Sequence, residues 1–148
     1  MSTPEENKAV MRRFEAAINA ADLAMRDTLL DEVVAPDYVD HSPIGIASQG
    51  GREGLKRALT AARAAFPDFR TTLHDLMGEG DKCAVRFTTS GTHRGEFAGI
   101  PPTDKSFAMP GIAIYRVRDG QLAERWAAAD QLGMMQQLGV IPAPGQAG

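Results

Sequence analysis

The chain has 148 residues, of which 43% are apolar and 24% are charged, and this length and composition are typical of one globular domain. The formal net charge of −3, without any Lys/Arg cluster, excludes the electrostatic footprint of a nucleic-acid-binding protein, and no segment approaches the roughly 20 apolar residues of a membrane span. The single cysteine, Cys83, excludes an intrachain disulfide, so a reducing cytoplasm is the expected location.

The first predicted helix begins at Pro4. Thr3 can cap it, proline suits the first helical position, and Glu6 completes a capping box. Apolar residues then recur at helical spacing, as Val10 and Phe14 do, so one face of the helix is apolar. The pattern therefore predicts a helix that packs on the rest of the domain, with Phe14 at the centre of the contact.

Two further helices are predicted in the first half of the chain. Asp22 is a preferred N-cap residue, and the apolar run behind it is stopped by Pro36. A Gly-rich segment follows and ends at Gly51. The third helix comes after this segment, with apolar residues at helical spacing, and Pro67 closes it.

Beyond the third helix the pattern becomes that of strands. Strands are expected over 69–77, 83–93 and 106–117, and a fourth strand, which carries the only tryptophan, follows the turn Asp119-Gly120. The Pro-Gly pair at 110–111 predicts a β-bulge, because proline cannot donate to a ladder and glycine allows a bend.

The order of these elements predicts an α+β fold. Three N-terminal helices followed by a long antiparallel meander should pack on a curved sheet and form a cone-shaped barrel with a hollow inside. Residues 1–141 are expected to form this single domain. The Pro/Gly/Ala-rich residues 142–148 are expected to be a disordered tail.

Asp130 is the first candidate for acid/base chemistry. It ends the tryptophan strand and precedes a short apolar helix, and because side chains alternate along a strand, Trp126, Ala128 and Asp130 point the same way. A carboxylate beside an indole in an apolar hollow suits such chemistry. The alternative is that Asp130 caps the helix, and one residue can do both.

Two histidines are the other catalytic candidates. His93 shares a strand face with Val85 and Phe87, so it is expected to reach the hollow. His41 follows the second helical region and is expected at the rim. The alternatives are a core or rim histidine with satisfied hydrogen bonds for His93 and a turn residue for His41.

No metal or cofactor is expected. The three histidines are dispersed, neither His-x-His nor His-Glu-x-x-His occurs, and Cys83 has no cysteine partner. Neither Ser90 nor Cys83 lies in a recognisable nucleophile motif. The residues expected to bind a substrate are apolar or aromatic, namely Trp126, Phe107, Met109, Tyr115 and Phe14.

Nearly the whole chain, from Glu6 to Gly139, resembles the SnoaL-like polyketide cyclases, also called ester cyclases. The resemblance is carried by short motifs distributed along the chain. They are Pro36-Asp37-Tyr38-Val39-Asp40-His41, Gly51-Arg52-Glu53-Gly54-Leu55-Lys56, Ala65-Phe66-Pro67-Asp68, Thr92-His93-Arg94-Gly95-Glu96-Phe97-Ala98-Gly99-Ile100-Pro101-Pro102-Thr103, Gly111, Asp119-Gly120, Glu124-Arg125-Trp126 and Asp130.

The resemblance implies the nuclear-transport-factor-2-like cone and a cofactor-free intramolecular aldol ring closure of a polyketide ester. It also implies that the carboxylate acid/base is Asp130, assisted by pocket histidines. One position departs from the family pattern, because many relatives have histidine where this chain has Arg125. Arg125 lies on the opposite strand face from Trp126, so we expect this change to fall outside the pocket.

The same fold also hosts epoxide hydrolases, isomerases and proteins without known catalysis, so fold alone leaves the reaction open. Epoxide hydrolysis uses two acids bridged by an arginine, and Arg116 and Asp130 are the candidates for part of that set. The alternative of another class is a non-catalytic protein that binds a small ligand.

A small hydrophobic carbonyl compound is the expected substrate, and neither nucleic acid nor membrane is an expected partner. A homodimer or homotetramer is expected, because the strand face that bears Arg86, Thr88 and Ser90 lies opposite the apolar face and leaves a broad outer surface.

Overall fold

The structure, a computed structural model, describes residues 2–42, 49–142 and 145, so most of the expected tail and of the Gly-rich segment lies outside the described residues. Within these residues, three helices and one strand form the first half of the chain, and four consecutive strands and a short helix follow. Its elements are α1 (Pro4–Asn19), α2 (Leu23–Val33), β1 (Val34–Asp40), α3 (Gly51–Ala65), β2 (Arg70–Glu79), β3 (Lys82–Thr92), β4 (Ser106–Arg118), β5 (Gln121–Ala129) and α4 (Gln131–Gln137).

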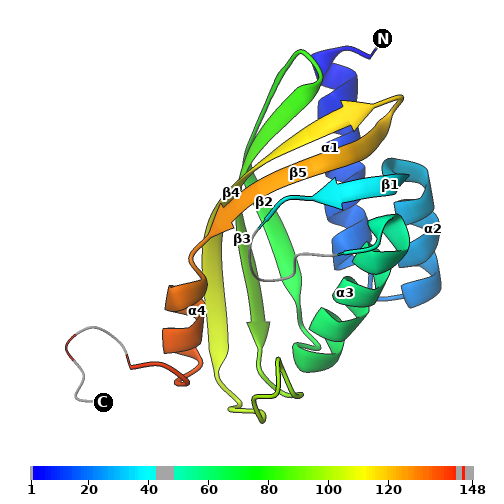
Figure 1. Cartoon of the computed structure of the whole chain (residues 1–148). Helices are drawn as coiled ribbons and strands as arrows, with labels where there is room; N and C mark the ends of the chain where they lie inside the picture. The colour runs from blue at the N-terminus through cyan, green and yellow to red at the C-terminus, as the bar shows by residue number, and fades with distance from the viewer. Residues whose placement is uncertain (1, 43–48, 143–144, 146–148) are drawn as a thin grey trace.

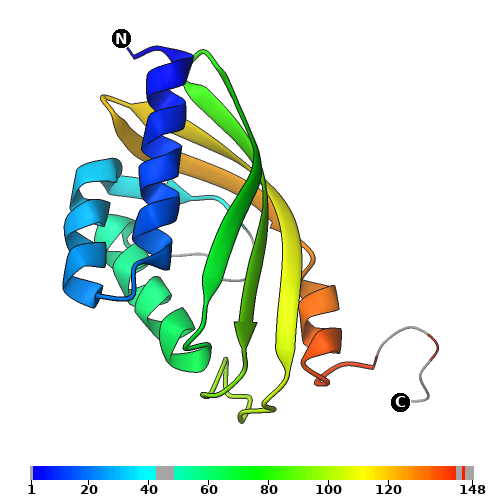
Figure 2. The same cartoon turned by 180° about the vertical axis from the view of Figure 1, so that it is seen from behind.

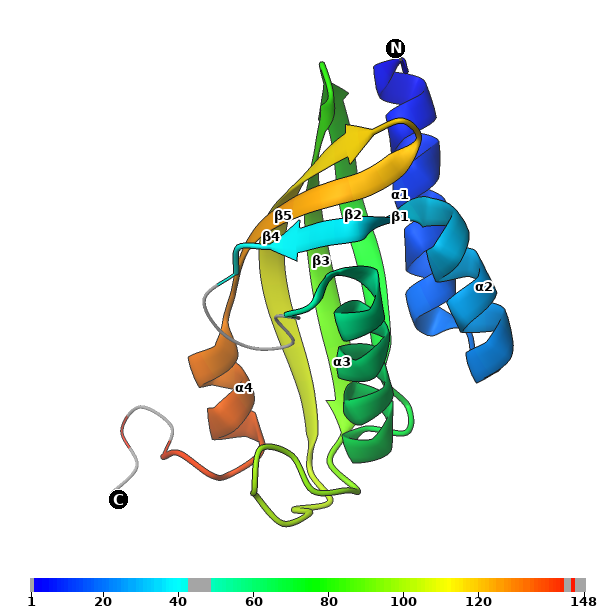
Figure 3. The same ribbon diagram turned by 45° about the vertical axis from the view of Figure 1, so that its right-hand side comes forward.

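The five strands form one curved sheet in the order β1-β5-β4-β3-β2. The strands β2 to β5 are antiparallel neighbours, and β1 joins β5 in parallel. α1 and α3 lie on the concave face of the sheet, α2 packs against α1, and α4 lies beside β4 (Figures 1 and 3). The predicted α+β cone with three N-terminal helices is confirmed, and its core lies between these helices and the sheet.

β1 is a strand that the sequence pattern does not predict. The apolar run before Pro36 fits a helix end as well as a buried strand. In the structure α2 ends at Val33 and the chain continues directly as a strand, with Val34 already extended at φ −117° and ψ 131°. Its register with β5 places Asp40 opposite Arg125, which is the pairing on which the site depends.

The bulge predicted at 110–111 is wrong. The pairing of β3 with β4 runs through this segment without a register shift. Gly111 pairs with Ala129, the last residue of β5, so the N–H that Pro110 lacks falls where the ladder has already ended. Gly111 has a packing role instead, because a Cβ there would overlap the ring of Phe87.

α1 covers the free edge of β2 with side chains. The Asn19 amide donates to the Thr71 carbonyl over 2.7 Å and accepts the Thr71 N–H over 2.9 Å. Two residues further along, the Leu73 N–H donates to Glu15 over 2.7 Å. Figure 2 shows α1 running alongside β2. These contacts satisfy backbone groups that an uncovered edge strand would leave to water or to another chain.

Gln137 of α4 does the same for β4 beyond the end of β5. Its Nε2 donates to the Ala108 carbonyl over 3.0 Å, and its Oε1 accepts the Ala108 N–H over 2.8 Å. α4 therefore replaces a strand for the length of one residue. Buried Met134 and Leu138 fix α4 to the core at this end of the cone.

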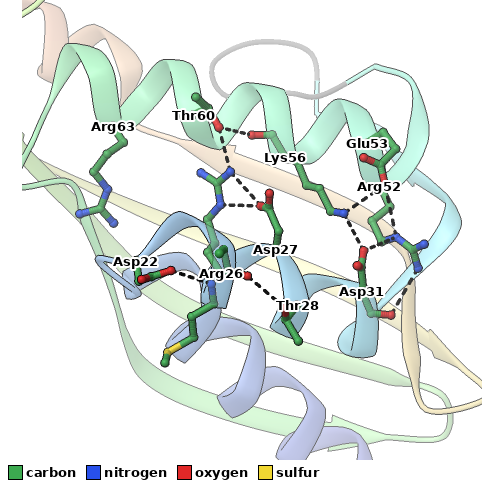
Figure 4. A network of polar contacts seen from close by, with 12 residues as sticks. Asp22, Arg26, Asp27, Thr28, Asp31, Arg52, Glu53, Lys56, Thr60 and Arg63 are labelled. Atoms are coloured by element: carbon green, nitrogen blue, oxygen red, sulfur yellow. Dashed lines mark hydrogen bonds and ion pairs between the residues drawn. The ribbon is translucent and has the colours of Figure 1, made fainter.

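A polar network joins α2 to α3 (Figure 4). The buried Arg26 side chain donates through Nη2 to Asp27 Oδ1 over 2.9 Å and to Thr60 Oγ1 over 2.8 Å. Further along the two helices, Lys56 Nζ lies 2.6 Å from Asp31 Oδ1. The network holds α2 against α3, and α3 supplies one wall of the cavity described below.

Replacement of Phe14 with alanine should lower the free energy of unfolding by about 3–5 kcal/mol, because the ring fills the core. Phe14 is 4% exposed, and its ring meets that of Tyr115 edge-on with the centroids 5.7 Å apart. Chemical denaturation measures the loss. Arg12→Ala on the exposed side of the same helix is the control and should change the free energy by less than about 0.5 kcal/mol. A loss below about 1 kcal/mol for Phe14→Ala would show that α1 does not seal the core.

Candidate active site

A cavity of about 80 Å³ lies between the helices and the concave face of the sheet. Its lining comes from α1, α3 and all five strands. Most of the lining side chains are apolar, namely Met11, Phe14, Ile18, Leu55, Leu59, Phe69, Leu73, Val85 and Phe87. The polar ones are Glu15, Tyr38, Asp40, Thr71, Thr89, Tyr115 and Arg125.

A buried ion pair lies in this lining. Arg125 Nη1 donates to Asp40 Oδ2 over 2.9 Å, and the Asp40 side chain is only 1% exposed. Asp40 Oδ1 accepts the Ser42 N–H over 2.9 Å, and Ser42 Oγ accepts a second bond from Arg125 Nη1 over 3.1 Å. Both carboxylate oxygens of Asp40 are therefore occupied, and the guanidinium is fixed in place.

Two phenols adjoin the ion pair. Arg125 Nε donates to Tyr115 Oη over 3.0 Å. Burial raises the pKa of Tyr115 and raises that of Tyr38 well above the usual value of about 10, so both side chains stay protonated at neutral pH. Burial opposes the charged form of Arg125, but Tyr115, Tyr38 and Asp40 hold its pKa above the usual value.

Among the residues that the structure describes, this end of the cavity has hydrogen-bond donors that no protein acceptor engages. A guanidinium has five N–H donors, and Nε and Nη1 account for the bonds that Arg125 makes. Within residues 2–42 and 49–142, Arg125 Nη2 and the hydroxyl protons of Tyr38 and Tyr115 have no acceptor assigned to them. Donors placed in a poorly solvated cavity stabilise an oxygen that gains negative charge during a reaction.

Asp130 and Trp126 do not face the cavity, and the expectation that they do is wrong. The alternation of side chains along β5 is as predicted, but the inner face carries Arg125 rather than Trp126, which is 38% exposed. The exposed Asp130 accepts the Gly133 N–H through Oδ1 over 2.9 Å and is the N-cap of α4. Exposed Ala128 shares this outer face. The variant Asp130→Asn, described below, tests the catalytic role expected of Asp130.

His41 also lies on the outer face of the sheet. Its Nε2 is 2.8 Å from Glu124 Oε2, and its ring stacks on Trp126 with centroids 5.0 Å apart. Arg116 Nε donates to the other Glu124 oxygen over 2.6 Å. His41, followed by Arg116, lowers the pKa of Glu124. Neither His41 nor Arg116 lines the cavity, so the arginine suggested for epoxide hydrolysis does not reach it.

His93 is completely buried, on the inner side as expected. Its Nδ1 accepts the Thr103 N–H over 3.3 Å and lies 3.1 Å from Thr103 Oγ1. Its ring packs against Phe66 with the centroids 5.5 Å apart. In the part of the chain that the structure describes, Nε2 has no partner. His93 belongs to the core and is not among the residues that line the cavity, so the expectation that it reaches the hollow is wrong.

The expected substrate-binding residues are divided between three places. Phe14 and Tyr115 line the cavity. Phe107 and Met109 are buried in the core without contributing to its lining. Trp126 lies outside. The sequence patterns did not identify Asp40, Tyr38, Glu15 and Arg125 as cavity residues. Positions 125 and 126 lie on opposite strand faces, so this alternation would have indicated Arg125 if the inner face of the strand had been known.

The fold and the cavity define a small cone-shaped domain that can hold one small molecule against a buried cation. None of the helices in the described ranges is long and apolar enough to cross a membrane. Among the same residues, no three His, Cys, Asp or Glu side chains gather as metal ligands would.

Comparison with known proteins gives the family. The sequence model of the SnoaL-like polyketide cyclases matches residues 8–138, and the chain belongs to this family. The chain is 26% identical to nogalonic acid methyl ester cyclase from Streptomyces nogalater over 112 aligned residues. The aligned segment covers 74% of this chain and 83% of that protein.

Solved structures agree with this assignment. TsrD from Streptomyces laurentii is 33% identical and superposes with a TM-score of 0.83 over 95% of this chain and 100% of its own. IdmH from Streptomyces antibioticus, a candidate polyketide cyclase, is 35% identical with a TM-score of 0.74, over 90% of this chain and 98% of its own.

Asp40→Ala should destabilise the fold by up to about 3 kcal/mol, because it leaves the Arg125 charge without its partner. The effect should lie at the lower end for buried pairs, since 19% of the Arg125 side chain stays exposed. Denaturant unfolding measures it. The double variant Asp40→Ala/Arg125→Met should recover most of the loss. A double variant no more stable than Asp40→Ala would mean that the isolated charge is not the cause.

Proposed function

We propose that the protein is a cofactor-independent cyclase that closes a ring on a hydrophobic, polyketide-like carbonyl compound. Family membership supports the reaction class, and one relative is named as a methyl ester cyclase. The observation that carries the proposal is the pair of donors on Arg125 and Tyr115 in a largely apolar cavity. The substrate carbonyl would lie against these donors.

The proposed reaction begins at a carbon flanked by carbonyl groups. A base removes a proton from this carbon, and the electron pair moves onto a carbonyl oxygen, which accepts hydrogen bonds from Arg125 Nη2 and the Tyr115 hydroxyl. The enolate carbon then attacks a second carbonyl of the same molecule, a carbon–carbon bond forms, and the resulting alkoxide takes up a proton. Substrate and product have the same mass.

Asp40 is a positioning residue in this proposal. Its charge balances that of Arg125 before the reaction, so a neutral carbonyl compound can enter the site without leaving an unpaired buried cation. The guanidinium is then already oriented when negative charge develops on the substrate, and preorganised donors of this kind lower the barrier most effectively.

The size of the cavity decides which part of the substrate it takes. A volume of about 80 Å³ is well below the roughly 300–1,000 Å³ of pockets that hold drug-sized ligands. We therefore propose that the reacting carbonyl enters the polar end, and that the apolar side chains of the lining repack around the remainder.

Epoxide hydrolysis is the second candidate, because the lining contains two acids, Asp40 and Glu15, together with Arg125. Mass spectrometry and NMR of the product separate the reactions. Ring closure leaves the mass unchanged but gives a product with a new NMR spectrum, hydrolysis adds one water, and a non-catalytic binding protein returns its ligand with both mass and NMR spectrum unaltered.

Tyr115→Phe should lower turnover by about 10²–10³-fold, because it removes one oxyanion donor while keeping the ring against Phe14. Asp130→Asn is the matched comparison, because asparagine caps a helix as well as aspartate does. It should leave both the melting temperature and turnover nearly unchanged. Turnover on a β-dicarbonyl ester and melting temperature are measured on each variant.

The opposite result would place the acid/base residue at the end of β5, at Asp130. If Asp130→Asn lost about 10²–10⁴-fold in turnover without loss of stability, and Tyr115→Phe lost none, Asp130 would be the acid/base group.

The homodimer or homotetramer stays a prediction, as does the cytoplasmic location. The outer sheet face that would be buried carries large exposed apolar side chains on β2, β4 and β5, namely Met77, Ile112, Ile114 and Trp126. Sedimentation at micromolar concentration should give at least a dimer, and Ile112→Lys should shift it toward the monomer. A wild-type chain that sediments only as a monomer contradicts the prediction.

A further inference from the structure

Glu15 brings a second carboxylate to the cavity from the helical side. It lies in the fourth turn of α1, is half-buried, and lines the cavity together with Met11, Phe14 and Ile18 of the same helix. Its Oε2 accepts the Leu73 N–H over 2.7 Å. Asp40 is on β1 and Leu73 is on β2, and these are the two edge strands of the sheet, so the two carboxylates are held at opposite ends of the strand order.

The bond to Leu73 does not by itself require a carboxylate. Asn19, one turn further along α1, performs the same edge-covering task at Thr71 with a neutral amide. Asn19 does not line the cavity, whereas Glu15 does. Of the two α1 side chains that cover the edge of β2, the one that also lines the cavity is therefore the carboxylate of Glu15.

The two carboxylates of the cavity differ in their partners. Both oxygens of Asp40 are engaged, one by Arg125 and one by the Ser42 N–H. Glu15 has a hydrogen bond on Oε2 only, and no described Lys, Arg or His nitrogen lies within 4.0 Å of its carboxylate. A carboxylate that no cation holds is better suited to accept a proton from carbon than one locked in an ion pair.

We propose that Glu15 is the acid/base residue of the ring closure, which rests on the function proposed above. Glu15 Oε1 takes the proton from the carbon between the carbonyl groups, while the enolate oxygen is held at Arg125 and Tyr115. After the carbon–carbon bond has formed, the protonated Glu15 gives the proton to the new alkoxide. The carboxylate is regenerated, and no co-reactant is consumed.

The test is deuterium exchange at C2 of methyl 3-oxobutanoate in D₂O, followed by NMR and corrected for the rate without protein. This small β-keto ester reports proton removal without ring closure. Glu15→Gln keeps an oxygen for the Leu73 N–H and removes the proton acceptor, so exchange should fall by about 10²–10⁴-fold with an unchanged melting temperature. Asn19→Ala, which weakens the same edge without touching the cavity, should lose stability but keep the exchange rate per folded molecule.

A second variant covers the case in which Glu15→Gln does not fold. Glu15→Ala opens space for a small external acid, and added acetate should restore exchange in proportion to its concentration, with no such effect on the wild type. Wild-type exchange in Glu15→Gln, or no rescue of Glu15→Ala, overturns the assignment of Glu15. If Tyr115→Phe still loses exchange in that case, the proposed function stands with another base. A wild-type chain that accelerates no exchange overturns both.

Discussion

The ion pair between Asp40 and Arg125 is the interaction on which the site depends. It exists because β1 pairs in parallel with β5 and places the two residues opposite each other. Without β1 the Arg125 charge would be buried among phenols and apolar side chains without a partner, which costs several kcal/mol. With it, the cone can keep a cation in its interior and remain stable.

The fold was largely predictable, because helix caps and strand alternation are local signals that agree with the tertiary structure. Thr3, Asp22 and Asp130 are N-caps as their sequence contexts indicate. The exceptions are instructive. An apolar run before Pro36 does not distinguish helix from strand, so the sequence did not predict β1. The pairing of Asp40 with Arg125, which depends on β1, was therefore not predicted either.

The site was less predictable, because strand alternation gives two faces without saying which one is inside. An indole suggests the interior and a guanidinium the surface, yet Trp126 lies outside, stacked on His41, and Arg125 lies inside. A buried charge needs a partner from elsewhere in the chain, and that information is not local. Catalytic sites are where such departures from the usual burial preferences are expected.

In the proposed site, Arg125 and Tyr115 stabilise negative charge on a bound oxygen. Absorbance of bound 4-nitrophenol across a pH series tests it directly, because the phenolate and the phenol differ in colour. Bound at these donors, the ligand should ionise at a lower pH than it does free in solution, and Tyr115→Phe should reduce the difference. Ionisation of the bound ligand at the same or a higher pH than in solution would contradict the account.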